Sequence, residues 1–279
     1  MINSITVHLN KNFEQMLQYA ANAGFKDVLL GFGSGNIFDD DDYEKNIEKL
    51  QVLFNRFGLT CGQTHLPSYH LTVSSEIKDE QTETRIRRAI KASAALGAKW
   101  TTYHPRTDIK NGYNRTKSFE ANAEILKGYL EDAEKCDIGI AVENMPLYPH
   151  ERPDWRFFGS GWEELCELCD TLNSDKLGIC WDFGHAHTAA LKQYIAIPEI
   201  GSRLKMTHVH DNYRRGDQHQ LPGLGSLEWD CVNWPKVIQA LKASGYQGSL
   251  ALEVLYPPLS MCESFMKLAY DSLEYLKSL

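Results

Sequence analysis

Eight short apolar segments that alternate with helical patterns constrain the fold of this 279-residue chain more than any other feature. The apolar segments read SITVHL, DVLLGF, LTCGQTHL, KWTTYHP, IGIAVENM, LGICWDFGH, LKMTHVHD and GSLALEVL. Helical periodicity marks stretches between them, including residues 12–24, 43–58, 83–98 and 118–136, and two of these end at a glycine. Strands that alternate with helices predict βαβ units and a parallel sheet. Eight such units in a chain of this length predict a closed (β/α)8 TIM barrel, with residues 1–279 as one domain.

An open, doubly wound sheet is the alternative α/β architecture. If it bound a dinucleotide, it would carry a glycine-rich turn after its first strand and before a helix. Here GFGSGN follows the second strand, has only part of that spacing, and leads into IFDDDD. We therefore interpret residues 31–36 as a loop. The four aspartates 39–42 are interpreted as a solvated turn and helix start rather than a metal site.

Composition narrows the class of protein. An apolar content of 43% and a charged content of 24% are ordinary for a soluble globular protein. The N-terminal residues lack the pattern of a signal peptide, and no apolar run approaches the length of a membrane span, so we expect a cytoplasmic protein. The net charge of −8 disfavours general binding to nucleic acid but leaves room for a local basic patch. Seven scattered cysteines argue against a disulfide scaffold, and the CELC segment at 166–169 is interpreted as part of a helix face.

Titratable side chains occur where the predicted strands end. In TIM barrels the active site is built at the C-terminal ends of the strands. Buried charges without partners are costly, so a ring of carboxylates and imidazoles at one mouth predicts a divalent cation there. Any one of these side chains alone would more often be a hydrogen-bonded core residue. The residues at these ends are His65, His104, Glu143, Asp182, His185, His208, His210 and Glu253.

The segment after the seventh strand adds two further candidate ligands. Asp217 and His219 form a D-x-H motif, and residues two apart in an extended segment point to the same side. Both side chains are therefore predicted to reach the same ion. Arg214 in this segment and Trp155 in the loop after the fifth strand are candidate contacts for a small anionic or sugar ligand, and His8 of the first strand is expected to line the same pocket.

Several motifs taken together resemble the xylose isomerase-like TIM-barrel superfamily, which includes sugar isomerases, epimerases and the endonuclease IV family (AP endonuclease family 2). The resemblance covers almost the whole chain. It rests on VEN at Glu143, WDFGHAH at Asp182 and His185, HVHD at His208, DQH with PGLGSLEW downstream, and LEV at Glu253. These motifs are specific for the superfamily and do not separate its members.

The resemblance to the isomerases and epimerases implies one divalent ion, Mn²⁺, Mg²⁺, Co²⁺ or Zn²⁺, held by Glu143, Asp182, His208 and Glu253. Glu143 and Glu253 would move a proton next to a metal-chelated carbonyl of a small sugar substrate, and His185 would bind a substrate hydroxyl. This is the function that we predict from the sequence. Assembly into a homo-oligomer is left open.

The resemblance to endonuclease IV implies a different site, with three zinc ions and phosphodiester hydrolysis. Its nine ligand positions correspond here to His65, His104, Glu143, Asp182, His185, His208, Asp217, His219 and Glu253. The glycine-rich first-strand signature GAHVSAAGG of that family is replaced by ITVHLNKN, and the loop after the second strand is acidic rather than basic. A barrel that binds a carbohydrate or metal without catalysis is the third alternative, although paired carboxylates on two faces exceed what binding needs.

The segment GICWDFGHAHTAA predicts how one strand delivers its ligands. We expect Cys180 and Trp181 on opposite faces of the sixth strand, with Asp182 as the last strand residue. Gly184 is predicted to allow a sharp turn that a Cβ atom would hinder, which would bring His185 back over the mouth.

Overall fold

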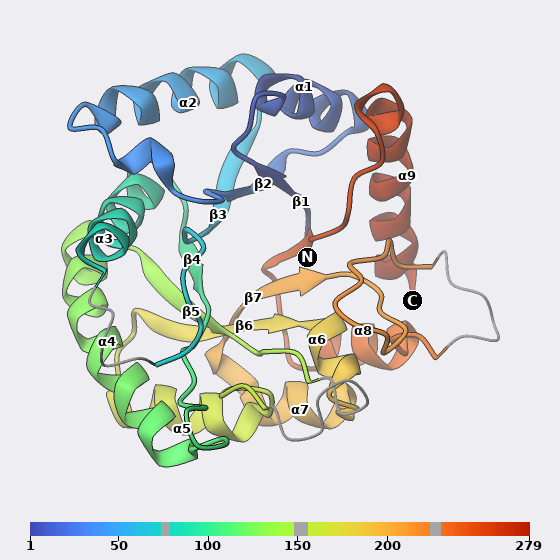
Figure 1. The fold of residues 1–279 in the computed structure, drawn as a ribbon. Helices are drawn as coiled ribbons and strands as arrows, with labels where there is room; N and C mark the ends of the chain where they lie inside the picture. The colour runs from blue at the N-terminus through green and yellow to red at the C-terminus, as the bar shows by residue number, and fades with distance from the viewer. Residues whose placement is uncertain (74–78, 148–155, 224–229) are drawn as a thin grey trace.

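The computed structural model describes residues 1–73, 79–147, 156–223 and 230–279. Eight parallel strands pair in chain order, and β8 pairs with β1, so that the sheet closes into a barrel (Figure 1). The predicted (β/α)8 architecture is confirmed. The strands are β1 Ile2–His8, β2 Asp27–Gly31, β3 Thr60–His65, β4 Trp100–Tyr103, β5 Gly139–Glu143, β6 Leu177–Asp182, β7 Leu204–Val209 and β8 Ser249–Leu252.

Helices surround the barrel on its outside (Figure 1). The α-helices are α1 Phe13–Ala23, α2 Tyr43–Phe57, α3 Glu80–Ala95, α4 Arg115–Cys136, α5 Trp162–Leu172, α6 Phe183–Thr188, α7 Gln193–Ile200, α8 Trp234–Ala243 and α9 Leu259–Ser278. Two short 3₁₀ helices, η1 Asn36–Phe38 and η2 Gly201–Arg203, complete the described elements. As predicted, α1 and α2 end at glycines in the left-handed conformation, Gly24 at φ 110° and Gly58 at φ 64°.

The strand segments alternate between two environments, as a period of two residues requires. In β6, Ile179 and Trp181 face the apolar layer between the barrel and the helices, whereas Cys180 faces the barrel interior. Cys180 and Trp181 therefore lie on opposite faces of the strand, as predicted, and both are fully buried.

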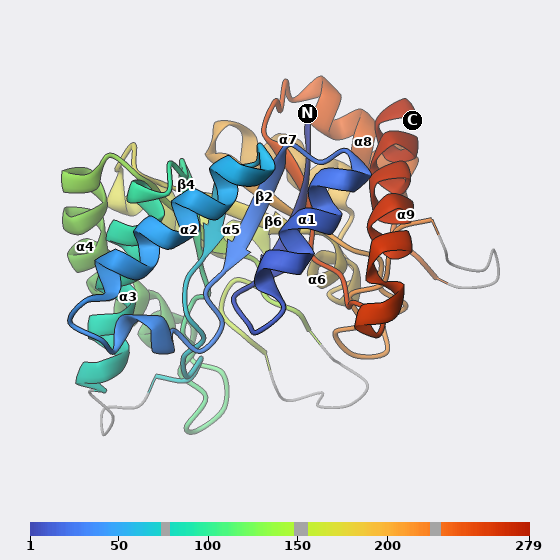
Figure 2. The same cartoon turned by 90° about the horizontal axis from the view of Figure 1, so that it is seen from above.

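A small apolar cluster fills the barrel interior below the mouth, and it consists of Leu29, Ala141, Cys180, Met206 and Ala251. Both termini lie at the end of the barrel where the strands begin, opposite the mouth (Figure 2). All seven cysteines are free, which agrees with the predicted lack of a disulfide scaffold. Among the described residues, no helix is long and apolar enough to cross a membrane.

The loop at residues 31–36 is confirmed as a turn that leads into η1 rather than a dinucleotide-binding helix start. The four aspartates 39–42 are exposed and precede α2, as predicted, and two of them also contact α3. Asp39 accepts a hydrogen bond of 2.7 Å from Arg85 Nε of α3, and Asp41 lies 3.3 Å from Arg88 of the same helix. These carboxylates are thus partly neutralised by α3.

Candidate metal centre

Four of the predicted ligands form the layer of the barrel interior directly above the apolar cluster. Each stands two residues beyond an inward-facing member of that cluster, so the alternation of the strand turns its side chain inward as well. The pairs, taken in chain order, are Ala141 and Glu143, Cys180 and Asp182, Met206 and His208, Ala251 and Glu253.

These four side chains, here called the quartet, converge on one point. His208 Nδ1 lies 3.0 Å from Glu143 Oε1, 2.9 Å from Glu253 Oε2 and 4.0 Å from Asp182 Oδ2. One ligand atom from each residue lies within 4.8 Å of every other, as in a mononuclear site. Glu143, Asp182 and His208 are fully buried, whereas the Glu253 side chain is 15% exposed and faces the mouth.

A second set of ligands, the His65 group, contains His65, His104 and Glu143. His104 Nε2 lies 2.8 Å from Glu143 Oε2 and 3.0 Å from His65 Nε2. The two carboxylate oxygens of Glu143 therefore face different ligand sets, because Oε1 faces the quartet and Oε2 faces the His65 group. A carboxylate in this arrangement is able to bridge two ions.

A third set, the His219 group, contains His185, Asp217 and His219. Asp217 Oδ2 lies 3.0 Å from His219 Nε2 and 3.4 Å from His185 Nε2. The D-x-H pair meets as predicted, but not for the predicted reason. His219 adopts φ 44°, in the left-handed region, rather than an extended conformation. Its backbone is held there by a hydrogen bond of 3.0 Å from Leu255 N to His219 O.

Backbone carbonyl groups orient three of these imidazoles. The Nδ1 atoms of His65, His185 and His219 lie 2.8, 2.8 and 2.7 Å from the carbonyl oxygens of Leu66, Asn144 and Glu253. Since a carbonyl oxygen only accepts, Nδ1 carries the proton, and the Nε2 lone pair is left to bind a metal ion. Such outer hydrogen bonds are typical of metal-ligating histidines.

The charges of the site call for cations. Burial opposes the protonated form of His208, yet Cys180, Glu143 and Glu253 raise the pKa of its imidazole well above the usual value. Burial likewise opposes ionisation of Glu143, but His208 and His104 hold the pKa of that carboxyl well below its usual range. The imidazoles thus compensate the carboxylates in the metal-free chain. A divalent ion would do the same more fully, so the donor set fits such an ion.

Asp182 ends β6 and also caps the helix that follows. Its Oδ1 accepts a hydrogen bond of 2.6 Å from His185 N and thereby caps α6, which begins at the next residue. His185 is therefore a helical residue rather than a strand end.

The prediction for Gly184 holds in part: a Cβ atom is excluded there, but by a neighbouring ring rather than by the backbone of a turn, because Gly184 is helical and its φ is not positive. A Cβ atom at Gly184 would lie 1.9 Å from His210 Cε1, so the glycine makes room for that ring. His210, which the sequence placed near the mouth without a role, is fully buried and has its Nε2 3.0 Å from both Asp182 oxygens. The H-x-H spacing of HVHD was the signal that could have assigned it a role.

The remaining predicted site residues lie around the mouth or outside the described residues. His8, at the end of β1, stands over Gly31, whose added Cβ would lie 2.4 Å from His8 Nδ1, and it is near enough to Glu253 to be affected by that charge. Arg214 Nε lies 3.1 Å from Asp230 Oδ2. Trp155 and residues 224–229 of the PGLGSLEW motif lie outside the described residues.

Three arginines close to the mouth, Arg106, Arg115 and Arg156, are paired with carboxylates. Arg106 lies 3.5 Å from Glu83, and Arg156 lies 3.2 Å from Glu164. Arg115 Nε also lies near Glu164, at 3.7 Å. Their charges are therefore largely compensated within the protein.

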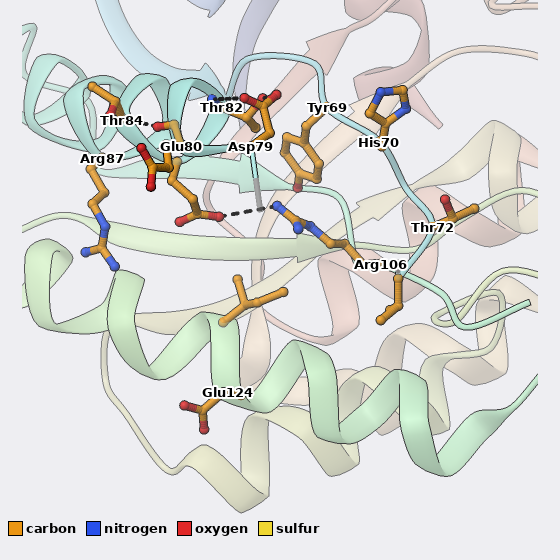
Figure 3. A pocket seen from close by; sticks show the side chains of 13 residues that line it. Tyr69, His70, Thr72, Asp79, Glu80, Thr82, Thr84, Arg87, Arg106 and Glu124 are labelled. Carbon is orange, nitrogen blue, oxygen red and sulfur yellow. Dashed lines mark hydrogen bonds and ion pairs between the residues drawn. The ribbon is translucent and has the colours of Figure 1, made fainter. Parts of the chain in front are cut away.

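A cavity of about 1020 Å³ lies beside the metal centre rather than in it, next to α3 and α4 (Figure 3). None of the nine predicted ligands is among its described lining residues. Arg106 points into it, with its guanidinium over the ring of Tyr69. The Tyr69 hydroxyl donates a hydrogen bond of 2.6 Å to the carbonyl oxygen of His104, which connects this wall to the mouth.

Comparison with known proteins assigns the family. Residues 17–279 match the family model described as xylose isomerase-like TIM barrel. The chain belongs to this family. The resemblance inferred from the VEN, WDFGHAH, HVHD and LEV motifs is thus confirmed.

The relatives of this chain include proteins with different names and one without an assigned activity. An uncharacterized protein of Methanocaldococcus jannaschii is 29% identical over 75% of this chain and 69% of its own length. A probable endonuclease 4 of Staphylococcus epidermidis is 27% identical over 68% of this chain and 66% of its own. The crystal structure of a D-tagatose 3-epimerase-like protein superimposes with a TM-score of 0.77 at 24% identity, covering 100% of this chain and 99% of that one. At that identity the likeness speaks for the fold alone.

Proposed function

We propose that this chain is a divalent-metal-dependent isomerase or epimerase of a sugar or sugar-derived substrate. The observation that carries the proposal is the quartet, in which Glu143 and Glu253 approach His208 Nδ1 within 3.0 and 2.9 Å from two separated strands. Carboxylates on two sides of one ion position supply what proton removal and return beside a carbonyl require.

The residues of the site have separate roles in proton transfer and in substrate binding. A divalent ion in the quartet would polarise a carbonyl group and acidify the adjacent C–H bond. Glu253, the more open carboxylate, takes a proton from the substrate carbon. Glu143 on the other side, positioned by His104, delivers a proton back to the substrate, so that no net proton is gained or lost. His185 accepts a hydrogen bond from a substrate hydroxyl at its Nε2, because its proton is on Nδ1, and His8 lines the rim of β1.

The pairing of the arginines supports a small substrate over nucleic acid. Binding to a phosphate backbone draws its affinity mainly from lysines and arginines that are free to neutralise phosphates. Arg106, Arg156 and Arg214 each already contact a carboxylate, and the chain carries a net charge of −8. A neutral or weakly charged sugar meets less repulsion at this mouth.

A phosphodiesterase with several metal ions is the second candidate, and one specific observation favours it. The nine ligand positions implied by the resemblance to endonuclease IV all lie in the quartet, the His65 group and the His219 group. Glu143 faces the first two of these sets with different carboxylate oxygens. Multinuclear sites of this kind clamp both oxygens of an in-line displacement at phosphorus. The sequence relationship to the probable endonuclease 4 supports this alternative.

Two measurements on one preparation test the proposal. The first counts metal ions per chain after purification without chelator. The second follows exchange of the substrate C–H proton in D₂O by NMR, with a panel of ketoses and with Mn²⁺ or Zn²⁺ added. We expect exchange at the carbon beside the carbonyl, and we expect Glu253→Gln to abolish it. Glu83→Gln, a carboxylate paired with Arg106, is the matched control and should keep it.

His104→Ala separates the two candidates. In the isomerase, the quartet and its ion persist in this variant, and proton exchange continues at a reduced rate. In the phosphodiesterase, the variant loses an ion and also loses hydrolysis of bis(p-nitrophenyl) phosphate. Three ions per chain with phosphodiester cleavage and no proton exchange would refute the isomerase.

A further inference from the structure

His210 occupies a built position between two of the ligand sets. Its ring is fully buried, and it fits only because Gly184 has no side chain. Its Nε2 lies 3.0 Å from each oxygen of Asp182, and its Nδ1 lies 3.2 Å from the carbonyl oxygen of Asp211. Neither the predicted quartet nor the nine-ligand set gives this residue a role.

Distance alone allows two roles for His210. Its ring lies close enough to His185, Asp217 and His219 to be a fourth ligand of the His219 group, since the four ligand atoms lie within 4.8 Å of one another. Four protein ligands would close that site, as in structural zinc sites. Alternatively, His210 serves Asp182 as a hydrogen-bond donor.

The ring planes decide between these roles. The imidazoles of His210 and His219 are stacked, with centroids 4.0 Å apart and planes inclined by 17°. A metal ion lies close to the plane of each imidazole that binds it, along the lone pair of the ligating nitrogen. Nearly parallel planes at this separation share no such point near both Nε2 atoms. The ring of His185, by contrast, stands at 90° to that of His219, and their planes do intersect nearby.

We propose that His210 is a positioning residue that fixes the Asp182 carboxylate for metal binding and does not itself bind metal. In this role the His210 ring carries its proton on Nε2 and donates it to Asp182, while the backbone amide of His185 holds Oδ1 from the other side. The carboxylate is thereby fixed in the orientation in which Oδ2 faces His208 Nδ1 and the quartet. The contact of Nδ1 with the Asp211 carbonyl oxygen, at 3.2 Å, is longer than the 2.7–2.8 Å contacts that place the proton on Nδ1 in His65, His185 and His219. The inference rests on the metal occupancy in the proposed function but not on the reaction.

Two substitutions of His210 test the role. A glutamine side chain places an amide N–H₂ group near the position of Nε2, so His210→Gln keeps donation to Asp182 but offers no imidazole to a metal. We expect His210→Gln to bind Zn²⁺ about as tightly as the wild type. His210→Ala should weaken binding at the quartet by about 10- to 100-fold, as is typical when an outer partner of a ligand is removed. Affinity is measured by competition with a chromogenic chelator, and circular dichroism checks the fold.

Double-mutant cycles assign the effect to one ligand set. Because His210 acts through Asp182, the loss caused by His210→Ala should vanish in an Asp182→Asn background and persist in a His219→Ala background. The opposite pattern would show that His210 belongs to the His219 group and would overturn the proposal. His210→Gln binding as weakly as His210→Ala would overturn it as well. Should His210→Ala not fold, the comparison of glutamine with wild type still decides. The readout involves no substrate, so failure of the sugar reaction leaves this test intact.

Discussion

The stability of the metal-free protein should depend on pH through His219. Burial opposes protonation of this imidazole, but Asp217 and Glu253 raise its pKa to about 9 in the metal-free chain. A group whose pKa is raised by folding stabilises the folded state fully below its unfolded pKa of 6.5, and this contribution is lost as the pH rises through 9. An ion held by the His219 group would occupy the Nε2 lone pair and remove this dependence, whereas the single ion of the quartet would leave His219 free to titrate.

The size of the effect follows from the two pKa values. The difference between about 9 and 6.5, at 1.36 kcal/mol per pKa unit, corresponds to roughly 3 kcal/mol. The side chain is only 19% exposed, so solvent screens its interaction with Asp217 only partly. Against a typical unfolding free energy of about 5–15 kcal/mol, a change of this size is readily measured.

The assay is urea unfolding of chelator-treated protein at pH 6 and pH 9.5, for the wild type and for His219→Gln. Other titrating groups cancel in the difference between the two proteins. The quantity to compare is the unfolding free energy of the wild type minus that of His219→Gln. We expect this difference to be about 3 kcal/mol larger at pH 6 than at pH 9.5. His70→Gln, which changes an exposed imidazole, is the matched control and should show no such difference. An equal wild-type advantage at both pH values in the metal-free protein would refute the reasoning, and loss of the pH dependence when Zn²⁺ is bound would show that an ion occupies the His219 group.

Three further outcomes are expected. Glu143→Gln should keep the fold but lose bound metal, measured by inductively coupled plasma mass spectrometry, because a neutral amide is a poorer ligand for a hard cation. Trp181→Ala should cost about 3–5 kcal/mol in chemical denaturation, because this ring fills the layer between barrel and helices. Gly31→Ala, whose Cβ would displace the ring of His8, should lower kcat/KM in the proton-exchange assay while the metal content stays unchanged.

The fold and the quartet were open to prediction because both depend on a short repeat. A residue two positions beyond an inward-facing alanine, cysteine or methionine also faces inward, and the strands bring Glu143, Asp182, His208 and Glu253 to one level. The pattern of apolar segments therefore predicted which strand ends meet at the mouth, and the family resemblance supplied the grouping of these four side chains as one ligand set. No knowledge of loops was needed.

The rest of the site depends on contacts that no repeat encodes. The left-handed backbone of His219 is set by its pairing with β8-flanking residues, and Gly184 is required by a ring 26 residues away along the chain. The plane of the His210 ring, which determines whether it binds metal or a carboxylate, is fixed only when α6 and the end of β7 pack together. The sequence placed His210 and His219 near the mouth but did not determine the orientation of their rings.

The double function of Asp182 has an evolutionary consequence. Its carboxylate both caps α6 and offers a charged oxygen to the metal centre. Asparagine caps a helix about as well as aspartate but brings no charge. A descendant without the proposed metal chemistry could therefore accept asparagine at this position at little cost in stability, whereas alanine would remove the cap of α6 and cost about 1 kcal/mol. Among divergent relatives, asparagine at this position should therefore mark proteins in which the helix cap is kept but the charged ligand is lost.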